Sequence, residues 1–223
     1  EDLVPLAFIL SISQLFRSFE SNSPATPIFH TFFFISLGSV IFPQFLYLVP
    51  LFWISMIPFR SISGKSLVAS ILGILTPYWF LFGYAFYSNE LTLFWTPLEE
   101  AIHFYPIHYG ALTLPEILSW GVITLLLIVS GVHYVSVSYL DKTRTRIFHS
   151  FLTIAGLWIT ICMALQPVHL HILMPIQLIC TAFLSGHLFT LTRNRFSGIL
   201  FIVTFVVFIL LMSFNLWMQF FNS

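Results

Sequence analysis

Charged side chains are scarce in this chain. Only 7% of its 223 residues are Asp, Glu, Lys or Arg, whereas soluble domains carry about 25%. So few charges cannot cover a water-soluble globule of this size, which excludes a soluble enzyme and a disordered tail. The eight acidic and eight basic side chains also balance, so no net basic field is present and no nucleic-acid partner is expected.

Cysteine is almost absent too. The two cysteines, Cys162 and Cys180, fall in neighbouring apolar segments. At 1.5 Å rise per helical residue their depths in a membrane would differ by roughly 10 Å, which is too far for a disulfide. We therefore predict two buried thiols.

Apolar residues dominate instead, at 58% of the chain with 18% aromatic. Several uncharged runs approach the roughly 20 residues that cross a bilayer as a helix. The sequence predicts an all-α polytopic transmembrane bundle, with the lipid bilayer as its surroundings. The five clearest predicted spans are Leu67–Tyr87, Ile117–Leu140, Ile147–Leu165, Leu170–Thr192 and Ser197–Phe221.

The N-terminal quarter is less regular. Leu3–Phe16 is a short apolar segment, and Pro27–Phe59 is long but interrupted by prolines. Because proline breaks a helix, Phe42-Pro43-Gln44 is interpreted as the bend of a helical hairpin. Each arm would have about 16 residues, so the hairpin either crosses twice through tilted, broken helices or is re-entrant. The bundle would then have up to about eight membrane helices.

The basic residues support this map. With Leu3–Phe16 as a span, alternation puts all eight on one side, which the positive-inside rule assigns to the cytoplasm. We expect a multi-pass inner-membrane protein whose loops 60–65, 141–146 and 193–196 are cytoplasmic. Loop 88–116, the N-terminus and the C-terminus would be periplasmic. Residues 1–223 are interpreted as a single transmembrane domain and, since the chain begins at Glu1 without Met, as a fragment lacking its N-terminal part.

The predicted spans contain no Asp, Glu, Lys or Arg, which counts against a proton- or sodium-coupled transporter. Histidines are their only titratable groups apart from phenols and thiols. His133, His149 and His187 fall in the cytoplasmic third of their spans, and His30 lies near the same side of the hairpin. A metal or haem site could use two of them. The favoured interpretation is that each bonds to a backbone carbonyl or to water, so no metal site is predicted.

Loop 88–116 is long enough to hold a site. Thr96-Pro97-Leu98-Glu99 is typical of a capped helix start, and a short interfacial helix to about Tyr105 is predicted. It would bring acids close to an imidazole, and such groups bind a head group, a cation or a leaving phosphate. The simpler alternative is a helix resting on lipid with its acids in water. The weak candidate catalytic residues are Glu99, Glu100, His103 and His108.

One pair of small residues, Ala69-x-x-x-Gly73, offers a close-packing helix face. We interpret it first as packing within the chain and second as a surface for a partner. Pro77 is expected to kink the helix that carries it.

A family resemblance extends over about 90 residues, from Leu3 to Phe94. The run Leu37-Gly38-Ser39-Val40-Ile41-Phe42-Pro43, the basic turn Pro58-Phe59-Arg60-Ser61 and the later Pro77-Tyr78-Trp79 resemble the repeating core of the type-C glycosyltransferases. Those membrane enzymes transfer sugars from polyprenyl-phosphate carriers. The chain is also similar to an uncharacterised polytopic inner-membrane family of Bacteroidota. The resemblance implies an essential acid in the first outer loop, and no position here matches it.

Three functional interpretations follow. The first is a glycosyltransferase-like module that handles a lipid-linked sugar in envelope biogenesis, with a polyprenyl-phosphate lipid as partner. Because the outer loops have acids but no Lys or Arg, phosphate neutralisation would need a divalent cation or residues outside this chain. The second is a non-enzymatic scaffold or subunit that packs against other membrane subunits. A transporter is the third.

Overall fold

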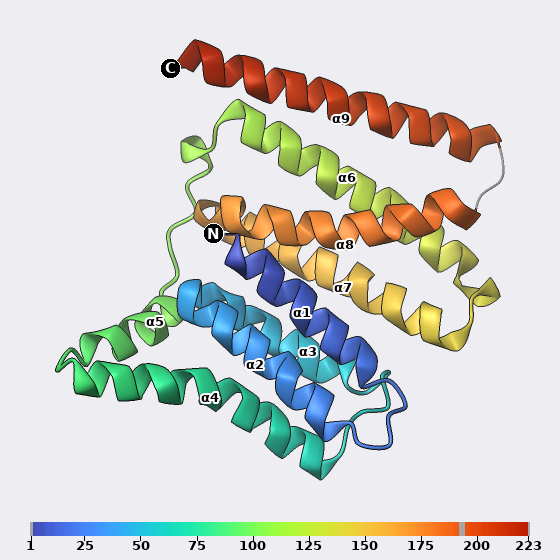
Figure 1. Cartoon of the computed structure of the whole chain (residues 1–223). Coiled ribbons are helices and arrows are strands. Elements are labelled where there is room, and N and C mark those ends of the chain that lie inside the picture. The colour runs from blue at the N-terminus through green and yellow to red at the C-terminus, as the bar shows by residue number, and fades with distance from the viewer. Residues whose placement is uncertain (1, 192–194, 223) are drawn as a thin grey trace. The chain divides into compact units, whose positions relative to one another are not determined.

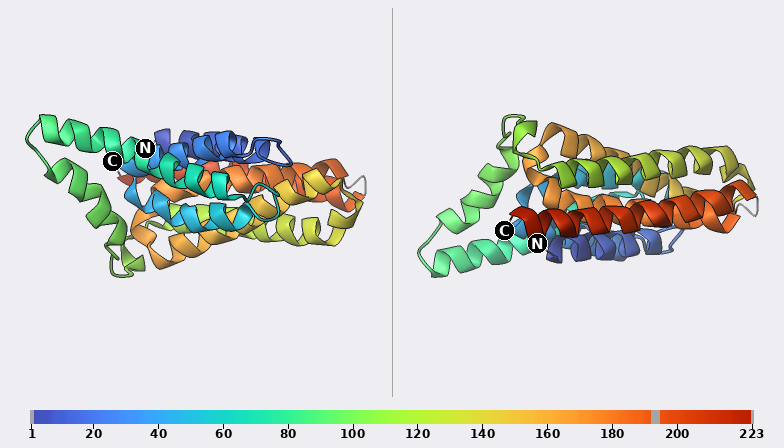
Figure 2. Two further views of the ribbon diagram at one scale, coloured as in Figure 1. Left: turned by 90° about the horizontal axis from the view of Figure 1, so that it is seen from below. Right: turned by 90° about the horizontal axis from the view of Figure 1, so that it is seen from above.

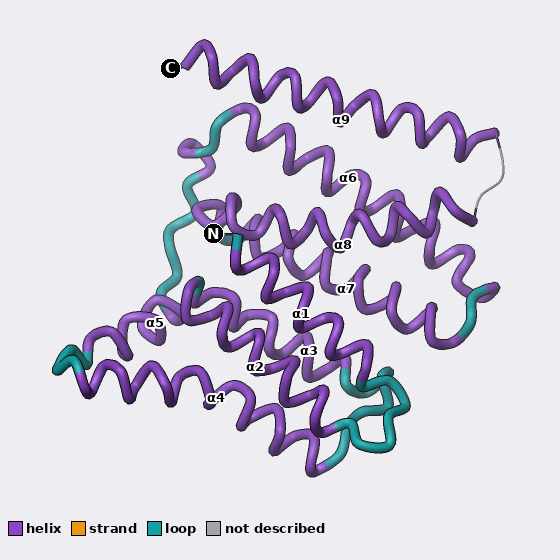
Figure 3. The backbone as a smooth tube through the Cα atoms, in the orientation of Figure 1, coloured by secondary structure: helices purple, strands orange, loops and turns teal. Residues whose placement is uncertain are grey.

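The described residues are mainly helical. The computed structural model describes residues 2–191 and 195–222, and these contain helices and turns but no strand (Figures 1 and 3). This confirms the predicted all-α class. The chain divides into two compact units, Glu1–Phe104 and Tyr105–Ser223, so the predicted single domain 1–223 has a division inside loop 88–116 that the sequence pattern did not indicate.

Unit 1 packs its helices around α2, which contacts both α1 and α4. A short helix, α5, folds back from the end of α4 across a tight turn (Figure 2). The elements of unit 1 are α1 Leu3–Arg17, α2 Ala25–Ile41, the 3₁₀ helix η1 Pro43–Leu48, α3 Val49–Ser55, α4 Gly64–Tyr87 and α5 Thr92–Ile102.

Unit 2 packs α8 against both α6 and α7, and α9 lies along α6 and α8. A fully buried amide links the three central helices, because Gln177 Nε2 on α8 donates to Thr124 Oγ1 on α6 at 3.0 Å and to Thr160 Oγ1 on α7 at 2.8 Å. The elements of unit 2 are η2 Tyr109–Ala111, α6 Leu114–Val137, η3 Ser138–Leu140, α7 Thr143–Leu165, η4 Pro167–His169, α8 Leu170–Leu191 and α9 Arg195–Asn222.

The five predicted spans are confirmed as long apolar helices. The described part of the chain contains five helices that are long and apolar enough to cross a membrane. No more than 39% of any of these spans is buried within the molecule, and exposed apolar side chains of this extent belong in lipid. Their bounds are Gly64–Tyr87, Leu114–Val137, Thr143–Leu165, Pro167–Thr190 and Gly198–Met218. Cys162 and Cys180 are free thiols, as predicted, although only Cys180 is fully buried.

The predicted hairpin bend is confirmed at Phe42. Helix α2 ends at Ile41, Phe42 is extended, and Pro43 begins η1. The second arm is not one α-helix, since six residues of 3₁₀ helix precede the seven of α3. At 1.5 Å per residue α2 is about 25 Å long, which is less than the roughly 30 Å of a hydrocarbon core.

The small-residue face of α4 packs inside unit 1, as first interpreted. A β-carbon at Gly73 would lie 2.5 Å from the backbone oxygen of Phe29, so α2 and α4 approach closely there. Ser36 Oγ donates to the Ile74 carbonyl at 2.6 Å, and the hydroxyls of Ser39 and Tyr78 are 3.0 Å apart. Buried hydroxyls therefore join the two helices where the backbones meet.

Basic residues gather at one end of each unit. In unit 1 the turns that follow α1 and α3 meet, because Glu20 N donates to the Phe59 carbonyl and Arg60 Nη1 lies 2.9 Å from Glu20 Oε1. Arg17 and Lys65 flank the same turns (Figure 3). In unit 2, residues 142–146 begin α7. The predicted loop 193–196 falls largely outside the described residues, which leave out 192–194 and the side chain of Arg195.

Candidate functional site

The four loop candidates occupy different settings. Glu99 and Glu100 lie on α5, His103 follows its last residue, and His108 precedes η2. All four are exposed. Three belong to unit 1 and His108 to unit 2, so no single unit assembles the predicted set.

The predicted boundaries of the loop helix are wrong. Helix α5 begins at Thr92, and the Thr96 hydroxyl donates to the Thr92 carbonyl inside the helix at 2.8 Å instead of capping its start. The helix ends at Ile102, before the predicted Tyr105, because His103 already has an extended backbone. Pro106 lies close beyond and disfavours helix in the residue before it.

Helix α5 is tied to the hairpin by its C-terminal carbonyls. Tyr47 Oη donates to the Ala101 carbonyl at 2.9 Å, and Gln44 Nε2 donates to the Glu100 carbonyl at 3.3 Å. Carbonyls in the last turn of a helix have no partner within the helix, so η1 supplies the missing donors. This contact keeps the end of α5 in place while the carboxylates of Glu99 and Glu100 remain exposed.

Glu116, at the end of this loop, has a structural role. Glu116 Oε2 accepts a hydrogen bond from Thr113 N at 2.9 Å and so caps the start of α6. Its other oxygen lies 3.1 Å from His171 Nε2 on α8. Glu116 therefore joins two helices of unit 2.

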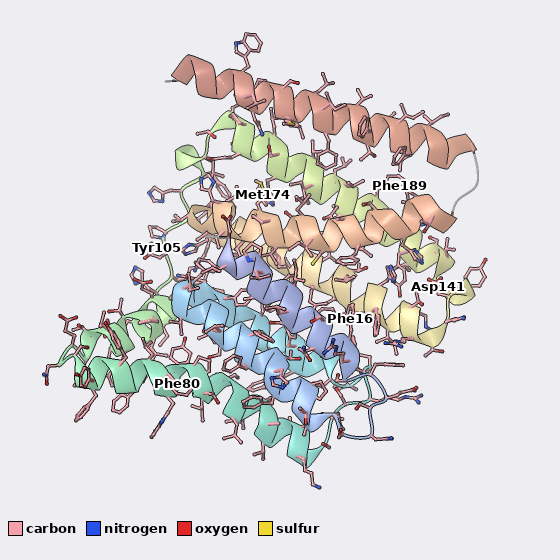
Figure 4. The ribbon with its side chains drawn as sticks, in the orientation of Figure 1. Phe16, Phe80, Tyr105, Asp141, Met174 and Phe189 are labelled. Carbon is pink, nitrogen blue, oxygen red and sulfur yellow. The ribbon has the colours of Figure 1, made fainter. Side chains whose placement is uncertain are left out.

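A second cluster of titratable groups lies at the basic end of unit 2. Asp141, labelled in Figure 4, stands between η3 and α7. Its Oδ2 is 2.9 Å from Nε2 of His187 on α8, and only 10% of the Asp141 side chain and 7% of the His187 side chain are exposed. A carboxylate accepts hydrogen bonds, so His187 donates through Nε2.

Two further rings complete this cluster. The His149 ring centroid on α7 is 4.3 Å from that of His187, and the Tyr134 ring on α6 stacks on His149 at 5.8 Å. His149 Nδ1 lies 2.9 Å from the Thr145 carbonyl, which can only accept, and the Tyr134 hydroxyl donates to the Arg146 carbonyl at 2.6 Å.

The prediction that each histidine bonds to a backbone carbonyl or to water holds for His149 and fails for His187. His149 bonds to a backbone carbonyl, as the favoured interpretation states. His187 instead bonds to the carboxylate of Asp141, which the sequence predicts to lie in the cytoplasmic loop 141–146. No periodic pattern relates positions 141 and 187, and the local signal was an acid placed directly before the basic residues Lys142, Arg144 and Arg146.

Among the residues that the structure describes, no group of three His, Cys, Asp or Glu side chains is arranged to hold a metal ion. A divalent cation at Glu99 and Glu100 would therefore need oxygen ligands from a substrate.

Comparisons with known proteins give no relative for this chain: no protein family, curated protein or solved structure matches it.

Proposed function

We propose that this chain is an inner-membrane module that handles a lipid-linked sugar in envelope biogenesis. One observation carries the proposal: η1 holds the end of α5 so that Glu99 and Glu100 are exposed. Helix α4, about 36 Å long at 1.5 Å per residue, has Lys65 in its first turn and leads to α5 at its other end. The two carboxylates thus lie at the end of unit 1 that is away from its basic residues. We assign this carboxylate-bearing end to the periplasm.

Exposed carboxylates have suitable chemistry for such a substrate. A carboxylate can accept the proton of an acceptor hydroxyl as a general base. Mg²⁺ is commonly bound by one or two carboxylates together with substrate phosphates. Glu99 and Glu100 could share a cation with a polyprenyl phosphate in this way.

The resemblance to type-C glycosyltransferases supports a role in handling lipid-linked sugars and not a complete active site. The bend at Pro43 and the basic turn at Arg60 are parts of the resembling pattern. Because no residue matches the essential acid of that family, the module would bind or position the lipid, with the catalytic acid supplied from outside this chain.

The test is a double substitution, Glu99→Gln with Glu100→Gln, in a strain that depends on the gene for this protein. We expect loss of complementation and less polyprenyl-phosphate lipid on the purified protein, measured by mass spectrometry. The control is Glu90→Gln, an exposed acid before α5. Full complementation and unchanged lipid content in the double variant would contradict the proposal.

A second function, a subunit of an envelope complex, is favoured by α9. None of the residues in its span Gly198–Met218 is buried within the molecule, so the helix has faces free for another membrane subunit. Gentle purification from native membranes separates the two functions. A partner protein at constant stoichiometry with only bulk phospholipid supports the subunit, whereas a retained polyprenyl phosphate supports the lipid-handling module.

A further inference from the structure

A cluster of titratable side chains lies at the basic end of unit 2. Asp141 and His187 are about nine-tenths buried in side-chain area, and each belongs to a different segment. Buried ionisable groups in membrane proteins are costly to retain and often mark proton sites. This cluster is independent of Glu99 and Glu100, which belong to unit 1.

The hydrogen bonds show where protons already sit. The Thr145 carbonyl requires a proton on His149 Nδ1, and the Asp141 carboxylate requires one on His187 Nε2. An additional proton on either ring must bind the other nitrogen of that ring. On His187 this nitrogen is Nδ1, which is buried and has no hydrogen-bond partner among the described residues.

The first and second additional protons have opposite effects. One proton on His187 creates an imidazolium beside the Asp141 carboxylate, so the buried pair becomes neutral overall. A second proton, on His149, places two cationic rings with centroids 4.3 Å apart. Like charges at this distance repel, and burial leaves little water to screen them.

We propose that Asp141, His149 and His187 form a proton-binding site that holds the turn between α6 and α7 against α8 and releases it when a second proton binds. Asp141 bonds this turn to α8. Because the released turn would bind more protons than the docked one, docking weakens as the pH falls. The site would thereby respond to acidity at the basic end of unit 2.

The surrounding basic groups also disfavour a second positive charge in the docked site. Lys142, Arg144 and Arg146 add positive charge to the turn and to the first residues of α7. His133 on α6 acts electrostatically on His187, whereas Asp141 is the only acid in the set. The titratable and charged groups around the site are His133 and Tyr134 from α6, Asp141 and Lys142 from the turn, Arg144, Arg146 and His149 from α7, and His187 from α8.

Amide hydrogen exchange of the full chain in lipid nanodiscs tests the proposal. After correction for intrinsic exchange, we expect residues 138–146 to exchange at least about fivefold faster at about pH 5.5 than at about pH 7.5. His149→Gln keeps the Asp141–His187 pair but cannot take the second proton, so it should abolish this increase. Exchange of residues 138–146 that does not depend on pH in the unsubstituted protein would overturn the proposal. The same acid-induced increase in His149→Gln as in the unsubstituted protein would overturn it too.

A second variant and a control keep the test decisive. Asp141→Asn can still accept from His187 Nε2 but removes the counter-charge, so the first added proton already disfavours docking, and the faster exchange of residues 138–146 should begin at a higher pH than in the unsubstituted protein. If His149→Gln does not fold, the proposal stands or falls on this result, and an onset at the same or a lower pH contradicts it. His30→Gln, an exposed imidazole of unit 1, should leave the pH effect intact.

Discussion

Gly73 shows how a single atom sets the packing of unit 1. The absence of a side chain there allows α4 to meet the backbone of α2, and Ser36 then reaches the Ile74 carbonyl. Helices in lipid have no hydrophobic force drawing them together, so close contact and hydrogen bonds must hold them. Gly73 therefore serves to pack α4 against α2 within unit 1.

We expect Gly73→Ala to destabilise the protein by about 1–3 kcal/mol, because the new β-carbon would lie 2.5 Å from the Phe29 oxygen. The measurement is unfolding by denaturant in detergent micelles. Gly83→Ala is the matched control on the same helix, where an added β-carbon meets nothing within 4 Å. There the change should be neutral or stabilising by up to about 1 kcal/mol. Equal effects at both positions would show that close approach is not the cause.

At the scale of elements, the hairpin and α5 depend on each other. A helix of 11 residues with no buried residue has little of its own to stabilise it. Tyr47 and Gln44 supply donors to its last turn, and these residues lie on η1 because Pro43 ended α2. The broken second arm thus positions the candidate carboxylates.

We expect the double variant Gln44→Leu with Tyr47→Phe to loosen α5 by about 1–2 kcal/mol, the sum of two modest hydrogen bonds. Amide hydrogen exchange of residues 92–102 should become faster while that of α4 stays unchanged. Tyr84→Phe, an exposed phenol on α4, is the control and should change neither. Unaltered exchange in α5 would mean that these bonds do not hold it.

At the scale of the whole molecule, two helical units each collect basic residues at one end. Arg17 and Arg60 mark that end in unit 1, and Lys142 marks it in unit 2. The positive-inside rule then predicts that both ends face the cytoplasm. The rule derives from the insertion of charged loops and not from packing, so it needs a test in cells.

Single cysteines at two positions test the topology, with Cys162 and Cys180 replaced by alanine. We expect Glu90→Cys to react with a membrane-impermeant maleimide in intact spheroplasts and Lys142→Cys to react only after lysis. Reversed labelling would place loop 88–116 in the cytoplasm and remove the basis for a periplasmic sugar substrate.

The sequence by itself determined the all-α membrane class, the five long spans and the bend at Pro43. These depend on local properties, namely the length of apolar runs and the missing donor of proline. The bounds of α5, Thr92 and Ile102, were missed. The donors that hold its C-terminal end come from residues some fifty positions earlier, and no local pattern relates them to this helix.

Only the tertiary structure decided which polar groups meet. It separated His108 from the other loop candidates by unit, gave Glu116 a capping role, and brought Asp141 to His187 across 46 positions. Hydropathy places residues by depth in the membrane, but it contains no information on which helices are neighbours. Contacts such as that of Gly73 with α2 select those neighbours, and with them the groups that share a buried site.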